Sequence, residues 1–179
     1  MTQLTPSVDY TDHAFGESFA PIELVEYGDY ECPHCGSAYP IVKDIQQQLG
    51  SDLRFVFRNF PLKKVHPHAF SAALATEAAG LQYKFWEMHD IIFENQGNLS
   101  LENILQLADE IDLDPDRLNN DMRQKGLIEK VERDFESGIR SGVNRTPTFF
   151  INGEMFDGNW HNEELLQTLK SLLINIIIS

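Results

Sequence analysis

Patterns typical of β-strands occur in only two parts of this sequence, and a long block without them lies between the two parts. The first part holds apolar runs at residues 22–27 and 53–58, with a helical pattern at residues 32–49 between them. The second part holds residues 148–151 and 154–156, separated by an Asn-Gly pair that is a strong hairpin signal. This order of strands and helices is typical of an α/β protein.

The block between the strands, about residues 61–141, contains helical patterns that follow one another. Ser100 and Asp114 each stand where an N-cap is expected, and Pro115 suits the first helical position after Asp114. We expect helices at about residues 67–80, 84–95, 101–111, 115–126 and 128–139, with Gly126 ending the fourth of them.

The composition fits one soluble domain with an acidic surface. The 179 residues include 28 acidic and 14 basic side chains, and the net charge of −14 argues against nucleic acids and anionic membranes as partners. Residues 1–20 form an expected polar arm without an export signal, and Asn162 is expected to cap a last helix. The apolar residues 172–178 are too few to span a bilayer, so we expect no membrane insertion. The expected location is cytoplasmic for the chain as written, or periplasmic or otherwise extracytoplasmic where a signal was removed.

The residues most informative about chemistry are Cys32-Pro33-His34-Cys35, which follow a strand and begin a helix. Two thiols on one helical turn can form a disulfide. The small ring that it closes removes little chain entropy, so the bond suits redox cycling better than structural stabilisation. The helix N-terminus and a protonated His34 lower the pKa of the Cys32 thiol, whereas Glu31 opposes them. A stabilised thiolate favours the reduced form and makes the disulfide a better oxidant.

A metal site is the alternative interpretation of the two cysteines. His66 and His68 would complete a set of four zinc ligands. Zinc knuckles usually place a turn between their cysteines, whereas these cysteines stand at a strand-to-helix junction with a proline beside the first thiol. The two histidines flank Pro67 at an expected helix start, where surface positions are more common. We therefore expect redox chemistry and no metal.

Two stretches of the chain resemble a known family. Residues 27–35, which contain the Cys-Pro-His-Cys motif, and residues 145–153 are similar to the DsbA-like thiol–disulfide oxidoreductases of the thioredoxin superfamily, in their shorter bacterial branch. The resemblance implies a single DsbA-like domain over residues 1–179 with a thioredoxin fold, a mixed sheet flanked by helices. It places the thioredoxin part at about residues 20–60 and 142–179, and an all-helical insertion at about residues 61–141.

The resemblance also implies roles for three further residues. Pro147 is the expected cis-proline that faces the disulfide, and Thr146 lies beside the thiols and contacts the substrate. Glu26, six residues before Cys32, is the expected buried acid that accepts a proton from Cys35. The alternative for Glu26 is an exposed carboxylate on a strand.

The expected function is exchange of disulfides with protein thiols and an unidentified redox partner, in which Cys32 attacks and Cys35 resolves. No cofactor is expected beyond the Cys32–Cys35 disulfide itself, with glutathione as a candidate co-substrate. Two alternatives stay open: a glutathione-dependent kappa-type transferase or isomerase relative, which does not need Cys35, and a substrate-binding or chaperone module without redox turnover.

Overall fold

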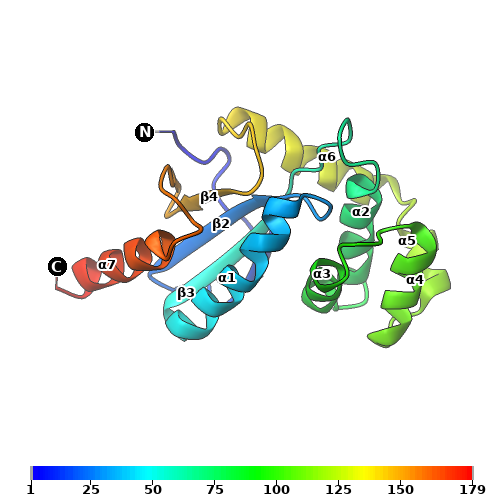
Figure 1. Ribbon diagram of the computed structural model, residues 1–179, viewed down its shortest axis with the longest axis horizontal. Coiled ribbons are helices and arrows are strands. Elements are labelled where there is room, and N and C mark those ends of the chain that lie inside the picture. The colour runs from blue at the N-terminus through cyan, green and yellow to red at the C-terminus, as the bar shows by residue number, and fades with distance from the viewer. Residues whose placement is uncertain (1, 179) are drawn as a thin grey trace. The chain divides into compact units, whose positions relative to one another are not determined.

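The computed structural model describes residues 2–178, which divide into two compact units. The sheet unit comprises residues 2–28, 37–58 and 137–178, and the helical unit comprises residues 29–36 and 59–136. Figure 1 traces the elements in chain order. Two long helices, α1 and α6, each contribute residues to both units.

The sheet unit is built on five strands in the order β1-β3-β2-β4-β5. Antiparallel pairing joins β1 to β3, β2 to β4 and β4 to β5, with Tyr27 opposite Thr148 in the second of these pairs. The strands are β1 (His13–Phe15), β2 (Ile22–Gly28), β3 (Leu53–Asn59), β4 (Thr148–Ile151) and β5 (Glu154–Met155). A short 3-10 helix η1 (Gly50–Asp52) precedes β3, and α7 (Glu164–Ile178) contacts β2. This mixed sheet with helices is a thioredoxin-like fold, as expected.

Strand β2 lies at the middle of the sheet and is buried on both faces. Its apolar residues Ile22, Leu24 and Val25 form part of the core, which explains why the sequence shows a continuous apolar run instead of alternation. Glu26 is buried in the same strand, opposite Phe149 of β4. The alternative of an exposed carboxylate at this position is therefore wrong.

The helical unit packs around one buried helix. Helix α2 (Ala69–Gly80) contacts α3, α4 and α5, and its run of small alanines is buried on every side. The other helices are α3 (Phe85–Glu94), α4 (Leu101–Glu110), α5 (Pro115–Asp121) and α6 (Lys125–Arg140), and α1 spans Pro33–Leu49. Ser100 and Asp114 are the N-caps of α4 and α5, and each side chain accepts a backbone hydrogen bond, as predicted.

Several boundaries differ from the predicted ones. The segment expected to be only a polar arm contains the edge strand β1. Helix α5 ends at Asp121, and Gly126 lies in the first turn of α6. Helix α7 begins at Glu164, so Asn162 does not cap it. The predicted hairpin turn is present, with positive φ angles of 49° at Asn152 and 85° at Gly153, the backbone geometry that favours this residue pair.

Candidate active site

The two cysteines lie where β2 passes into α1, in the helical unit. The backbone N–H of Cys32 donates to the Asp29 carbonyl at 3.1 Å, and the Cys32 carbonyl accepts from the N–H of Gly36 at 3.1 Å. Cys32 thus precedes the first helical residue, Pro33, whose missing N–H would have had no partner there. Cys32 and Cys35 are buried and come within 4.0 Å of each other.

This position favours a thiolate on the first cysteine. The first turn of α1 contains no acidic residue, so no carboxylate of the helix itself opposes the positive end of the helix dipole at Cys32, although Asp29 and Glu31 precede it in the chain. Pro33 and His34 are exposed and lie at the surface of the same turn. The expected contribution of His34 to the thiolate stays a prediction.

The carboxylate of Asp29 organises the turn that carries the cysteines. Its Oδ1 accepts the backbone N–H of Glu31 at 2.8 Å, and its Oδ2 accepts the backbone N–H of Leu62 at 2.8 Å. The Nδ1 atom of His66 lies 2.8 Å from the same Oδ2. The backbone N–H of Asp29 points to the Sγ of Cys35 at 3.4 Å. This one buried residue therefore connects the second cysteine with the loop that follows β3.

His66 faces an acidic environment. Burial alone would lower the pKa of His66, but the hydrogen bond with Asp29 and the charges of Asp29, Cys32 and Glu31 raise it above the ordinary value. The imidazole is therefore protonated to a higher pH than that of an ordinary histidine.

A second histidine of the same loop binds the neighbouring acid. The backbone N–H of His68 donates to Glu31 Oε2 at 2.6 Å, and His68 Nδ1 lies 3.0 Å from Glu31 Oε1. The His68 side chain is 47% exposed and that of His66 is 19% exposed, so only His68 has the surface position that was expected. Among residues 2–178, no cluster of three or more His, Cys, Asp or Glu side chains has an arrangement that would hold a metal ion.

Gln96 holds the active-site turn from outside the motif. Its Nε2 donates to the carbonyls of Tyr30 at 2.9 Å and Cys32 at 2.7 Å. Its Oε1 occupies the space where a Cβ atom on Gly36 would lie. The Tyr30 hydroxyl in turn lies 2.9 Å from Nδ1 of the buried His89.

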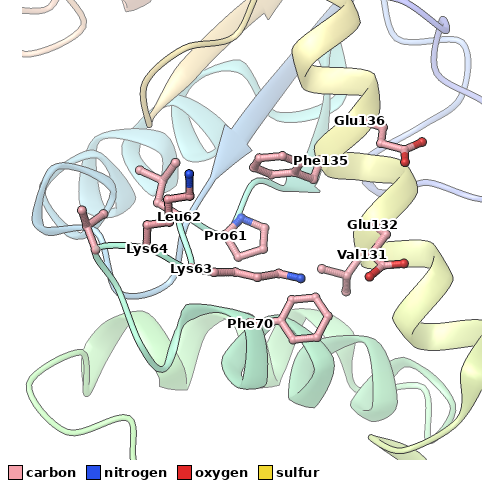
Figure 2. Close-up of a pocket in the computed structure, with 10 residues that line it drawn as sticks. Pro61, Leu62, Lys63, Lys64, Phe70, Val131, Glu132, Phe135 and Glu136 are labelled. Carbon is pink, nitrogen blue, oxygen red and sulfur yellow. The ribbon is translucent and has the colours of Figure 1, made fainter.

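The loop after β3 also lines a cavity of about 700 Å³ within the helical unit (Figure 2). Phe135 of α6 and Phe70 of α2 contribute to its largely apolar lining, and the Lys63 ammonium lies 3.6 Å from the centroid of the Phe70 ring. Leu62 lines this cavity as well, while its backbone N–H binds Asp29. One loop thus connects the cavity with the turn that carries the cysteines.

The remaining predicted site residues belong to the sheet unit. Thr146 and Pro147 are buried, directly precede β4 and are joined by a cis peptide bond, which confirms the expected cis-proline. Glu26 lies on the neighbouring strand β2. The roles of Glu26, Thr146 and Pro147 toward the cysteines stay predictions.

Sequence reasoning missed three residues of the site, namely Asp29, His66 and Gln96. An Asp whose side chain accepts the backbone N–H two residues later is a common turn signal, and this signal points to Asp29. His66 was considered only as a zinc ligand or a surface residue. Gln96 follows α3 and carries no local signal.

One family model and several curated proteins match this chain. The chain matches a family model described as thioredoxin over residues 9–171. The Na⁺/H⁺ antiporter NhaA 1 of Salinispora arenicola is 41% identical over 160 residues, which cover 89% of this chain and 24% of the antiporter. The chain spans about a quarter of the length of the curated relatives it matches. No helix among residues 2–178 is long and apolar enough to cross a membrane.

Two solved structures share the fold over nearly the whole chain. Oxidised BdbD from Bacillus subtilis is 25% identical with a TM-score of 0.81, covering 91% of this chain and 93% of BdbD. The α-DsbA1 protein of Wolbachia pipientis is 21% identical with a TM-score of 0.84, covering 96% of this chain and 95% of that protein. With the family model matching most of its length, the chain belongs to the thioredoxin family, and its fold is that of the DsbA-like thiol–disulfide oxidoreductases.

Proposed function

We propose that this protein exchanges disulfides with protein substrates, with Cys32 as the attacking thiolate and Cys35 as the resolving thiol. The observation that supports this most is the pair of buried cysteines, 4.0 Å apart, at the N-terminus of α1. The helix N-terminus stabilises a thiolate at Cys32, and a neighbouring thiol that close can displace whatever the first one has bound.

The proposed reaction in the reducing direction has two exchange steps. The Cys32 thiolate attacks one sulfur of a substrate disulfide, forms a mixed disulfide and releases the other substrate sulfur as a thiolate. Cys35 then loses a proton, attacks the Cys32 sulfur and releases the second substrate thiolate. Two electrons pass from the two cysteines to the substrate, and the Cys32–Cys35 disulfide results. The oxidising direction is the same sequence in reverse.

The sheet unit supplies the proposed supporting groups. Glu26 is the proposed acceptor of the Cys35 proton, because it is buried in β2 and burial of a carboxyl group favours its protonated form. Thr146 and Pro147 bind the substrate backbone directly before the start of β4. The direction of exchange follows the compartment: donation of disulfides where the surroundings are oxidising, and reduction, with glutathione as a candidate co-substrate, in a cytoplasm.

Reduction of insulin by dithiothreitol tests the function. The protein is expected to accelerate insulin reduction, and Cys32→Ser is expected to abolish the acceleration. A kappa-type glutathione transferase would tolerate Cys35→Ser, and a binding or chaperone module would show no thiol-dependent turnover in any variant. Either result would contradict the proposal. A redox titration against glutathione then fixes which direction is feasible.

Trapping of substrates tests the separate roles of the two cysteines. Cys35→Ala is expected to accumulate mixed disulfides with protein substrates, because the attacking thiolate remains and the resolving thiol is gone. Cys32→Ala is expected to accumulate none. Non-reducing gels of both variants, incubated with an unfolded disulfide-containing protein, provide the measurement. Equal trapping by the two variants would show that the nucleophile is wrongly assigned.

A further inference from the structure

A histidine outside the Cys-Pro-His-Cys motif shares a carboxylate with the turn that carries the cysteines. His66 Nδ1 lies 2.8 Å from Asp29 Oδ2, and the backbone N–H of Asp29 points to Cys35 Sγ at 3.4 Å. Leu62 donates its backbone N–H to the same oxygen, so the loop that carries His66 is fixed against Asp29 at two points.

The negative charge of Asp29 affects whether the cysteines of this turn can form a thiolate. Asp29 is buried in the turn that carries the cysteines, and an uncompensated carboxylate in that turn disfavours formation of a thiolate there. Glu31 adds a second negative charge in the same turn, and its carboxylate is bound by His68. Among these groups, the one that binds the Asp29 carboxylate and can carry a positive charge is His66.

We propose that His66, as an imidazolium bound to Asp29, is a positioning residue that stabilises the thiolate of Cys32 from outside the motif. This role deepens the proposed exchange reaction, and its effect on the redox equilibrium rests on that reaction. The charge of Cys32 is itself among the causes that raise the pKa of His66, so the two groups favour each other's charged forms.

The coupling acts on only one of the two redox states. The reduced protein carries the thiolate, and the disulfide carries no charge. Loss of the His66 cation therefore destabilises the thiolate of the reduced protein but not the disulfide. The equilibrium with glutathione shifts toward the disulfide. Linkage also requires the reverse effect, in which loss of the Cys32 thiolate lowers the pKa of His66.

The first measurement is the pKa of Cys32, determined from the ultraviolet absorbance of the thiolate in a Cys35→Ser background. His66→Gln is expected to lower the acid dissociation constant of Cys32 by about tenfold, the lower end of what a nearby opposite charge provides. His66→Lys, which keeps a positive charge, is expected to recover part of the effect. His161→Gln is the matched control, because His161 is an exposed histidine stacked on Trp160 in the sheet unit.

The second measurement needs no substitution at His66. Titration of the His66 imidazole by NMR in the reduced protein and in Cys32→Ser is expected to give a lower pKa in the variant. This comparison decides the matter where His66→Gln fails to fold. An unchanged His66 pKa in Cys32→Ser, or a Cys32 titration that His66→Gln leaves unaltered, would overturn the inference. Failure of insulin reduction with the coupling intact would reject the proposed function and leave the charge coupling standing.

Discussion

Gly36 directly follows the second cysteine, and the space beside it is filled by Gln96. Alanine normally stabilises a helix relative to glycine by roughly 0.5–1 kcal/mol. Here the added Cβ would overlap Gln96 Oε1, and Gln96 holds the carbonyls of Tyr30 and Cys32. We therefore expect the opposite sign: Gly36→Ala lowers the free energy of unfolding by about 1–3 kcal/mol, measured with urea.

A double-variant cycle separates this contact from a general effect of helix composition. In a Gln96→Ala background the overlap is gone, so Gly36→Ala is expected to be neutral or stabilising there. A stabilising effect of Gly36→Ala in the otherwise unchanged protein would show that Gln96 does not constrain this position.

The raised pKa of His66 makes part of the stability of the protein depend on pH. A histidine whose pKa is higher in the folded than in the unfolded state adds stability that is fully present below the unfolded value, about 6.5, and is lost as pH rises through the folded value. His66→Gln is therefore expected to destabilise the protein more at about pH 6 than at about pH 9. Urea unfolding at both pH values measures the difference, with His161→Gln as the control. An equal loss at both values would mean that Asp29 does not favour the cation.

The residues of the site differ in how visible they are from the sequence. Cys32 and Cys35 were predicted because a two-residue spacing at a helix start is a local pattern. His66 and Gln96 reach the same turn from positions separated from their partners by 37 and 64 residues, respectively. No periodicity or capping rule describes such contacts, because they arise only when α3 and the loop after β3 have packed around the turn.

At the scale of the elements, α5 shows how much a short helix depends on its cap. The helix spans Pro115–Asp121 and buries Leu118, and the Asp114 side chain accepts the N–H of Arg117 at 2.9 Å. Asp114→Ala is expected to lower the free energy of unfolding by about 1 kcal/mol, whereas Asp114→Asn keeps an acceptor and is expected to stay near the unchanged protein. Urea unfolding measures both variants. Equal losses of unfolding free energy in the two variants would assign the effect to the negative charge instead.

The elements were predicted well where one local signal dominated and less well where tertiary packing decided. Ser100 and Asp114 were identified as caps because their chemistry acts within a few residues. Strand β1 was missed because its three residues, His13–Phe15, form no apolar alternation and are held by pairing with β3. Gly126 was interpreted as a helix end, yet it lies inside α6, where the apolar face of a long helix outweighs the unfavourable propensity of one glycine.

At the scale of the whole chain, Arg58 fastens the N-terminal segment to the sheet. All five N–H groups of its guanidinium have acceptors: both oxygens of Asp12 at 2.8 Å, the carbonyls of Pro6 at 2.9 Å and Ser7 at 3.2 Å, and the Tyr27 hydroxyl at 3.0 Å. The Tyr27 hydroxyl lies 2.7 Å from Ser137 Oγ of α6. Burial disfavours the charged guanidinium, but its hydrogen bonds and charge interactions with Asp12 and Tyr27 outweigh the effect of burial and raise the pKa of Arg58.

Removal of Arg58 is therefore expected to be far more damaging than removal of a partly exposed arginine on the same strand. The side chains of Arg58 and Asp12 are 3% and 4% exposed, so Arg58→Met leaves a buried carboxylate without its cation and is expected to lower the free energy of unfolding by about 3–5 kcal/mol. Arg54→Met is the matched control, because Arg54 and Glu23 are 21% and 26% exposed and 3.4 Å apart, and such a pair contributes about 1 kcal/mol or less.

The same network predicts that its two charged members do not act independently. In an Asp12→Asn background, Arg58→Met no longer leaves a buried carboxylate without its cation. The double variant is therefore expected to lose less unfolding free energy than the sum of the losses in the two single variants. Limited proteolysis within residues 2–15 is expected to be faster in Arg58→Met than in Arg54→Met, because the carbonyls of Pro6 and Ser7 lose their donor. Equal unfolding free energies for Arg58→Met and Arg54→Met would show that the hydrogen bonds of Arg58 do not stabilise the N-terminal segment.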